Sequence, residues 1–141
     1  MPDDLTIRAF RIEDYDAAVH LWSRVEGVEI AEGDSREEIT AYLSRNPDLS
    51  RAAEADGQLI GVALCGHDGR RGLIYHVAVD AAFQQRGVAR QLVNECVAGL
   101  RRVGLKRALI LVARDNTAGE TFWRRCGWEQ VPNVKVFGID L

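Results

Sequence analysis

The sequence predicts an α/β (α+β) fold with a mixed, mostly antiparallel central sheet of six to seven strands and helices on both faces. Short strands joined by turns fill the middle of the chain, and a long amphipathic helix over 88–103 follows the last of them. A further strand and helix come next. The expected order is β-α-α-β-β-β-α-β-α-β-β, and 141 residues suit one domain over 1–141.

The first half of the chain predicts one strand and two helices. Residues 5–11 alternate as a strand with one buried face, and Asp14 then opens a helix. The apolar residues of that helix share one side, namely Tyr15, Ala18, Val19, Trp22 and Val25. Ser35 and Glu38 form a capping box for a second helix, which ends at Pro47.

The rest of the chain predicts the centre of the sheet. Strands over 51–54 and 59–65 flank a hairpin turn at Asp56-Gly57, and residues 67–72 turn into a central strand over 73–79. After the long helix come a strand over 107–113 and a helix that begins at Asp115 or Asn116. Gly127 suits a left-handed C-cap for that helix, and residues 128–131 and 134–139 predict two closing strands.

Composition excludes several classes of protein. A net charge of −3 and a pI near 5.6 argue against broad nucleic-acid binding. No apolar run reaches the ~20 residues of a membrane span, and Met1-Pro2-Asp3-Asp4 lacks the basic and apolar parts of a signal peptide. Three cysteines without C-x-x-C spacing predict small core residues in a reducing cytoplasm, and the separated histidines predict no metal site.

Residues 84–89 (QQRGVA) join the apolar strand over 73–79 to the long helix. The joint points the unpaired N–H groups of a helix N-terminus at whatever lies beyond the strand, and Gly87 lets the backbone approach a ligand closely. Such amides bind a diphosphate without a lysine. The loop lacks both the G-x-G-x-x-G fingerprint and the G-K-[ST] of a P-loop.

Residues 84–89 follow the pattern Q-x-x-G-x-A. In residues 116–128, an Asn opens a helix that closes with Gly and an aromatic residue. Together the two segments resemble the GNAT superfamily of N-acetyltransferases, in its small bacterial single-domain type. The resemblance implies the GNAT fold and transfer of an acetyl group from acetyl-coenzyme A to a primary amine by direct attack in a ternary complex. By analogy it also implies a homodimer.

The resemblance also implies a set of cofactor-binding residues. Backbone groups of Val77, Ala78 and Val79 would meet the pantetheine arm and the thioester. The diphosphate would lie against the loop formed by Gln84, Gln85, Arg86, Gly87, Val88, Ala89 and Arg90. Asn116 would face the pantetheine amides, although helix capping also explains it. Trp123 stands where family members often carry a tyrosine that acts as general acid, and an indole N–H cannot donate a proton at useful pH, so packing is the favoured role.

A general base is also needed, because an alkyl amine arrives protonated. The family often has a carboxylate on the central strand, whereas this chain has Tyr75 and His76. His76 is the first choice of base, Tyr75 the second as base or acid, and a buried histidine without catalytic role or a water relay remain alternatives. Because neighbouring strand residues point to opposite faces, only one of the two should face the substrate cleft.

The acidic segment over 26–34 is expected to shape the acceptor site and to attract a cationic amine such as a small amine, a peptide N-terminus or a lysine; a solvated loop is the alternative. Two other functions stay open. One is a catalytically impaired GNAT-fold module that binds coenzyme A or acyl-coenzyme A. The other is an unrelated phosphate-binding α/β domain.

Overall fold

The computed structural model describes residues 4–141, which form two compact units, one that ends at Leu111 and one of Val112–Leu141. Each unit is described separately. The expectation of no signal peptide depends on residues 1–4. Three of these four residues, Met1-Pro2-Asp3, lie outside the described residues. Within residues 4–141, no helix combines the length and the apolar character needed to cross a bilayer.

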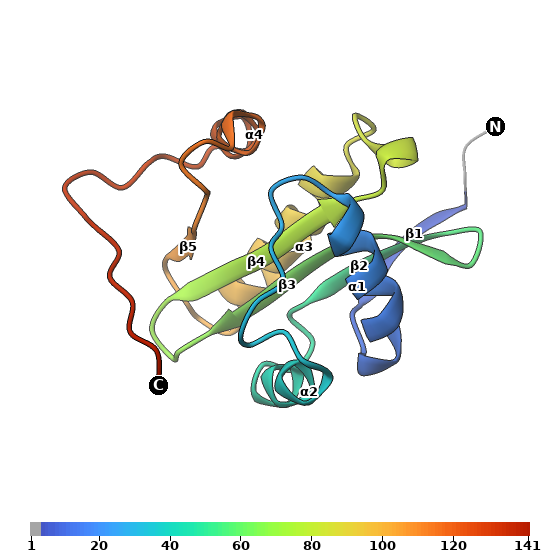
Figure 1. Cartoon of the computed structure of the whole chain (residues 1–141), viewed down its shortest axis with the longest axis horizontal. Coiled ribbons are helices and arrows are strands. Elements are labelled where there is room, and N and C mark those ends of the chain that lie inside the picture. The colour runs from blue at the N-terminus through green and yellow to red at the C-terminus, as the bar shows by residue number, and fades with distance from the viewer. Residues whose placement is uncertain (1–3) are drawn as a thin grey trace. The chain divides into compact units, whose positions relative to one another are not determined.

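The first unit contains a five-stranded sheet with the order β1-β2-β3-β4-β5 (Figure 1). Neighbouring strands pair antiparallel up to β4, and β4 pairs with β5 in parallel, as expected for a mixed, mostly antiparallel sheet. The last strand has only three residues, fewer than the segment predicted. The strands are β1 (Leu5–Ala9), β2 (Arg51–Ala55), β3 (Gln58–His67), β4 (Gly72–Val79) and β5 (Ala108–Ile110).

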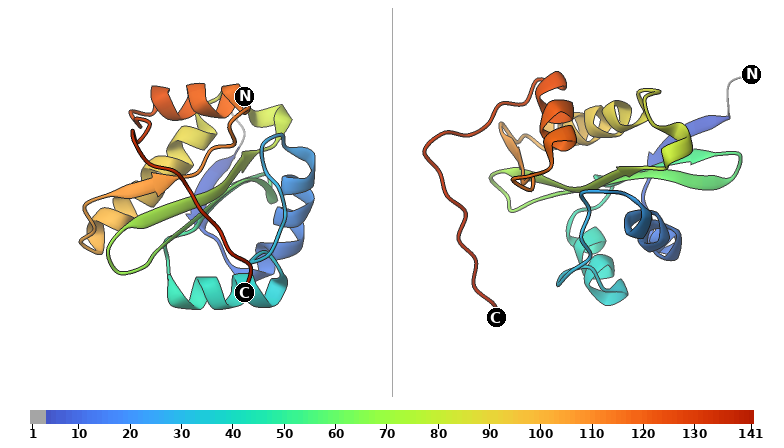
Figure 2. Two further views of the ribbon diagram at one scale, coloured as in Figure 1. Left: turned by 60° about the vertical axis from the view of Figure 1, so that its left-hand side comes forward. Right: turned by 45° about the horizontal axis from the view of Figure 1, so that its top comes forward.

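Three helices cover the two faces of this sheet, α1 (Tyr15–Arg24), α2 (Arg36–Arg45) and α3 (Val88–Arg102). Figure 2 shows α1 and α2 on one face and α3 on the other, which confirms helices on both faces. The helix α3 lies close to β4 at Gly72, where a Cβ atom would come within 2.5 Å of Leu100 Cδ1. On the opposite face, Leu21, Trp22 and Ile39 are almost fully buried against the sheet.

Local signals fixed the helix ends. The predicted capping box at α2 is present, because Ser35 Oγ accepts from the Glu38 N–H at 3.1 Å and the Glu38 carboxylate accepts from the Ser35 N–H at 3.2 Å. Before α1, the Asp14 carboxylate accepts two hydrogen bonds of 2.8 Å from Arg8, whose Nε also donates to Glu54. This ion cluster joins β1, β2 and the beginning of α1.

The second unit contains α4 (Thr117–Arg125), which begins at the predicted Asn116 cap and ends before Gly127 with a φ of +90°. The prediction of two closing strands over 128–131 and 134–139 is wrong, because no strand follows β5 in the described part of the chain. Alternating side chains show which residues share a face, but they do not supply the neighbouring strand whose N–H and C=O groups a ladder needs.

Candidate active site

The loop between β4 and α3 takes its shape from local hydrogen bonds. The Asp80 carboxylate accepts from the Ala82 N–H at 2.9 Å and caps a short 3-10 helix, η2 (Ala81–Phe83). The Gln84 side-chain amide then donates to the Val79 carbonyl at 3.0 Å. Gln84, predicted to bind the cofactor, therefore ties the loop to the end of β4 through its side chain.

The backbone after Gln84 presents a row of N–H donors. Gln85 and Gly87 both have left-handed backbones, with φ of +63° and +81°. The first helical hydrogen bond of α3 runs from the Gln91 N–H to the Gly87 carbonyl at 3.0 Å. Among residues 4–141, no hydrogen bond occupies the N–H groups at five positions, namely Gln85, Gly87, Val88, Ala89 and Arg90.

The space beside Gly87 is open, since a Cβ atom built there meets nothing within 4 Å apart from its own chain neighbours. Unpaired amides at a helix N-terminus, in a loop with left-handed backbone at Gln85 and Gly87, form a geometry that binds anions. The side chains contribute less: Val88 is a core residue, the Arg86 guanidinium lies over the Phe83 ring at 5.2 Å, and Arg90 is exposed. The loop therefore fits the diphosphate of coenzyme A.

The second half of β4 has an unpaired edge. The parallel ladder to β5 ends at the pair Ile74 and Ile110, so within the described chain no strand pairs with that side of residues 75–79. The predicted pantetheine-binding residues Val77, Ala78 and Val79 lie on this stretch. Ala78 and Val79 are buried and Val77 is half-buried, so at residues 78 and 79 the backbone is the part that a ligand can reach.

A β-bulge interrupts the same stretch at His76. Val62 pairs with Ala78 and Leu64 with Tyr75, so that one residue of β3 opposes two of β4. His76 takes a left-handed φ of +51°, which costs about 1–3 kcal/mol for a residue other than glycine. The fold holds it there: the Trp22 Nε1–H donates to the His76 carbonyl at 3.3 Å, and the two rings lie 4.9 Å apart.

The bulge changes which side chains share a face. Tyr75 and His76 both line one pocket, so the prediction that only one of them faces the cleft is wrong. The prediction assumed the period-2 alternation of a regular strand, and the left-handed residue at 76 breaks that alternation. Burial raises the pKa of Tyr75, so its hydroxyl stays protonated at neutral pH.

The His76 ring forms a hydrogen bond with a carboxylate from a distant part of the chain. Its Nε2 lies 2.9 Å from Asp34 Oδ2, which also accepts from the Ala31 N–H at 3.0 Å. Asp34 is 8% exposed, and its carbonyl accepts from the Tyr15 hydroxyl at 2.6 Å. Because a carboxylate only accepts, the shared proton belongs on Nε2, and Nδ1 keeps the lone pair that can take a proton.

The pocket around this pair has a volume of about 390 Å³. It brings residues of the acidic segment together with His76, and nothing in the sequence indicated that Asp34 in particular hydrogen-bonds His76. The one clue in the sequence that Asp34 takes an ordered position was its place directly before the helix cap at Ser35. The pocket is lined by Glu29, Ala31, Glu32, Gly33, Asp34, Ile39, Tyr42, Leu64, Tyr75 and His76.

The two predicted site residues of the second unit have local partners. Asn116 Oδ1 accepts from the Gly119 N–H at 2.9 Å, the geometry of a helix N-cap. Trp123 packs edge-on between Phe122 and Trp128, with ring centroids 5.1 and 4.9 Å apart. Helix capping and aromatic packing thus account for both side chains within their own unit.

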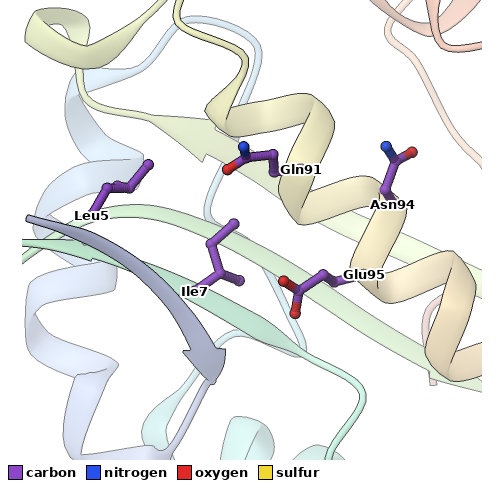
Figure 3. A pocket seen from close by; sticks show the side chains of 5 residues that line it. All are labelled: Leu5, Ile7, Gln91, Asn94 and Glu95. Carbon is purple, nitrogen blue, oxygen red and sulfur yellow. The ribbon is translucent and has the colours of Figure 1, made fainter. Parts of the chain in front are cut away.

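A second hollow of about 400 Å³ lies between β1 and α3 (Figure 3). Leu5 and Ile7 form one side, and Gln91, Asn94 and Glu95 form the other. None of the predicted site residues lines this hollow. Among residues 4–141, no group of three or more His, Cys, Asp or Glu side chains is arranged to hold a metal ion.

The sequence profile described as the Acetyltransferase (GNAT) family matches residues 14–128. The chain belongs to this family of acyltransferases. An acetyltransferase of Pectobacterium atrosepticum is 31% identical over 127 residues, which are 90% of this chain and 89% of that protein. The predicted family and class of enzyme are therefore confirmed.

Solved structures share the fold at low sequence identity. The ribosomal-protein-S18-alanine N-acetyltransferase of Escherichia coli has a TM-score of 0.76 and 20% identity, covering 90% of this chain and 79% of its own. The aminoglycoside N-acetyltransferase AAC(6')-Iy in complex with CoA has a TM-score of 0.77 and 19% identity, covering 100% of this chain and 98% of its own. The GNAT fold is confirmed, and the predicted co-substrate agrees with the ligand of the second structure.

Proposed function

We propose that this protein transfers the acetyl group of acetyl-coenzyme A to a primary amine by direct attack in a ternary complex. The observation that carries the proposal is the hydrogen bond between His76 and Asp34 in a pocket beside the open edge of β4. It supplies a base, oriented by a buried carboxylate, where an amine can enter.

Acetyl-coenzyme A, when bound, supplies the activated acetyl thioester. The unpaired amides of Gln85, Gly87, Val88, Ala89 and Arg90 would hold its diphosphate, and the backbone of residues 77–79 would face the pantetheine arm and the thioester. Arg90, which is exposed on the first turn of α3, would add charge attraction to the phosphates. Asn116 and Trp123 remain proposed contacts of the same cofactor.

His76 would remove the proton that an ammonium group carries into the pocket. Nδ1 accepts it, and the Asp34 carboxylate stabilises the resulting imidazolium through Nε2–H. The neutral amine then attacks the thioester carbon, so that the C–N bond forms and the C–S bond breaks. As the amide forms, the attacking nitrogen loses its second proton to solvent, and the proton held by His76 passes to the departing thiolate. A thiol with a pKa near 8.5 is an acceptable leaving group without a tyrosine at position 123.

Other features fit a cytoplasmic enzyme of one domain. The family match runs from residue 14 to residue 128 and so includes parts of both compact units, which supports one domain over 1–141. Cys65 and Cys96 are buried and form no disulfide among the described residues, as a reducing compartment would keep them. Homodimer formation rests on analogy with relatives.

The test is the release of free thiol from acetyl-coenzyme A with and without a panel of primary amines. His76→Ala should lower kcat by about 10²–10⁴-fold, while His20→Ala, a change on the exposed surface of α1, should leave it unchanged. Equal rates for the two variants would reject His76 as the base.

Binding titrations separate the alternative functions. A protein that binds coenzyme A but never releases thiol in response to an amine is an impaired binding module, for which the tryptophan at position 123 is the motivating observation. Tight binding of ATP or NAD without coenzyme A binding indicates an unrelated phosphate-binding domain.

A further inference from the structure

Part of the wall of the His76 pocket is aliphatic and aromatic, formed by Ile39, Tyr42, Leu64 and Tyr75. Ile39 and Leu64 are 2% and 3% exposed and belong to the hydrophobic core, so this part of the wall is fixed in place. The Tyr42 and Tyr75 rings meet edge-on with centroids 6.5 Å apart. An aliphatic and aromatic surface therefore lies in the same cavity as the proposed base.

The loop side of the pocket is acidic. In the part of the chain that the structure describes, the carboxylates of Glu29 and Glu32 make no ion pair or hydrogen bond, and both residues line the cavity beside Asp34. An amine that enters this pocket meets both carboxylates and apolar surface. This charge complementarity orients an amine with its nitrogen toward the loop and His76 and its carbon skeleton toward the wall.

The same wall disfavours polyhydroxylated amines. Hydroxyl groups placed against Ile39 and Leu64 would lose their water and gain no hydrogen bond from these two side chains, whereas each methylene buried there is stabilised. The volume of about 390 Å³ is near the lower end of the range for small-molecule sites, which favours a compact acceptor.

We propose that the acceptor is a small primary amine with an unsubstituted alkyl or arylalkyl body, which packs on Ile39, Leu64, Tyr42 and Tyr75. This inference rests on the proposed acetyl transfer and narrows its substrate class. The acceptor amine forms the new amide bond, and the free thiol and one proton leave as the other products.

A homologous series of amines tests the proposal. From ethylamine to pentylamine, kcat/KM should rise about fourfold per methylene until the pocket is full. 2-Phenylethylamine should be a good substrate, while ethanolamine and glucosamine should be poor ones. Tyr75→Ser should flatten the dependence on chain length, whereas Tyr75→Phe, which keeps the ring, should retain it.

The outcomes separate this inference from the proposed function. A flat series, or a higher kcat/KM for glucosamine, putrescine or a leucine-initiated peptide than for pentylamine, would overturn the alkylamine class and leave amine acetylation standing. Thiol release that no amine accelerates would overturn the proposed function and the acceptor class with it. If Tyr75→Ser leaves the dependence of kcat/KM on chain length unchanged, the role given to this wall is also overturned.

Discussion

The loop over 84–90 and the His76 pocket are constructed in opposite ways. The loop offers backbone N–H groups from one contiguous stretch, whereas the pocket depends on side chains from the segment before α2, from α2 itself and from two strands. A backbone site needs only the right local conformation. A side-chain site needs the whole unit to bring together residues such as Asp34 and His76, which are 42 positions apart.

This difference predicts different responses to mutation. In the loop, most side chains should be replaceable, and the positions with left-handed backbone should not be. In the pocket, the identity of each polar side chain should decide activity. The following substitutions test the contrast.

Asp34→Asn should have the largest effect, a fall in kcat of about 10²-fold with the Kd for coenzyme A unchanged. An amide cannot stabilise the imidazolium as a carboxylate does, although it fills the same space. Steady-state kinetics with a saturating amine measures it. Glu26→Gln, the same loss of charge on the same loop but outside the pocket lining, is the control, and equal kcat values for the two variants would contradict the role of Asp34.

Gly87→Val should weaken coenzyme A binding about tenfold or more, because a β-branched residue resists a φ of +81° and places methyl groups before the donors. The matched control is Gly104→Val, at the other end of α3, where φ is +92° and the space is equally open. Both variants should lose similar stability, about 1–2 kcal/mol. Isothermal titration should show lost affinity only for Gly87→Val; equal affinities would argue against the anion site.

Trp22→Phe should lower kcat several-fold, since it removes the N–H that donates to the His76 carbonyl and keeps an aromatic ring beside the imidazole. The buried carbonyl left without a donor should also cost about 1–3 kcal/mol of unfolding free energy. Kinetics and denaturant unfolding are measured on the same preparation. A stability loss without any change in kcat would mean that the bulge tolerates a looser hold.

Asp14→Asn should lower stability at pH 7 and leave the loop over 84–90 and the His76 pocket unaffected. Burial raises the pKa of Asp14, but hydrogen bonds from Arg8 and from the Arg11 N–H outweigh it, so the pKa lies below its usual value. A lowered folded-state pKa stabilises the protein above the unfolded-state value, and that contribution disappears as the pH falls through the folded-state pKa. The variant should be about 1 kcal/mol less stable at pH 7, after allowance for solvent screening, and equal to the wild type in strong acid.

Urea unfolding between pH 7 and pH 2 measures this difference. A constant gap between the two proteins over that range would show that the ionised carboxylate is not what stabilises the fold.

The sequence predicted well what short-range chemistry decides. The Ser35 and Glu38 cap, the Asn116 cap and the left-handed Gly127 each depend on a few neighbouring residues, and each is present. The bulge at His76 was not predicted, because a positive φ is uncommon at any residue other than glycine and the register with β3 is a long-range property. The prediction of two closing strands was wrong for the same reason, because a strand depends on the sheet edge with which it pairs.

Under the proposed mechanism, the left-handed backbone at His76 sets thermostability and turnover against each other. Glycine at this position would relax the local strain, and a search for a more heat-resistant variant would be drawn to it. The same replacement would delete the ring that meets Asp34. Laboratory selection for survival at high temperature alone would therefore be expected to favour glycine at position 76. The selected proteins would be folded but inactive.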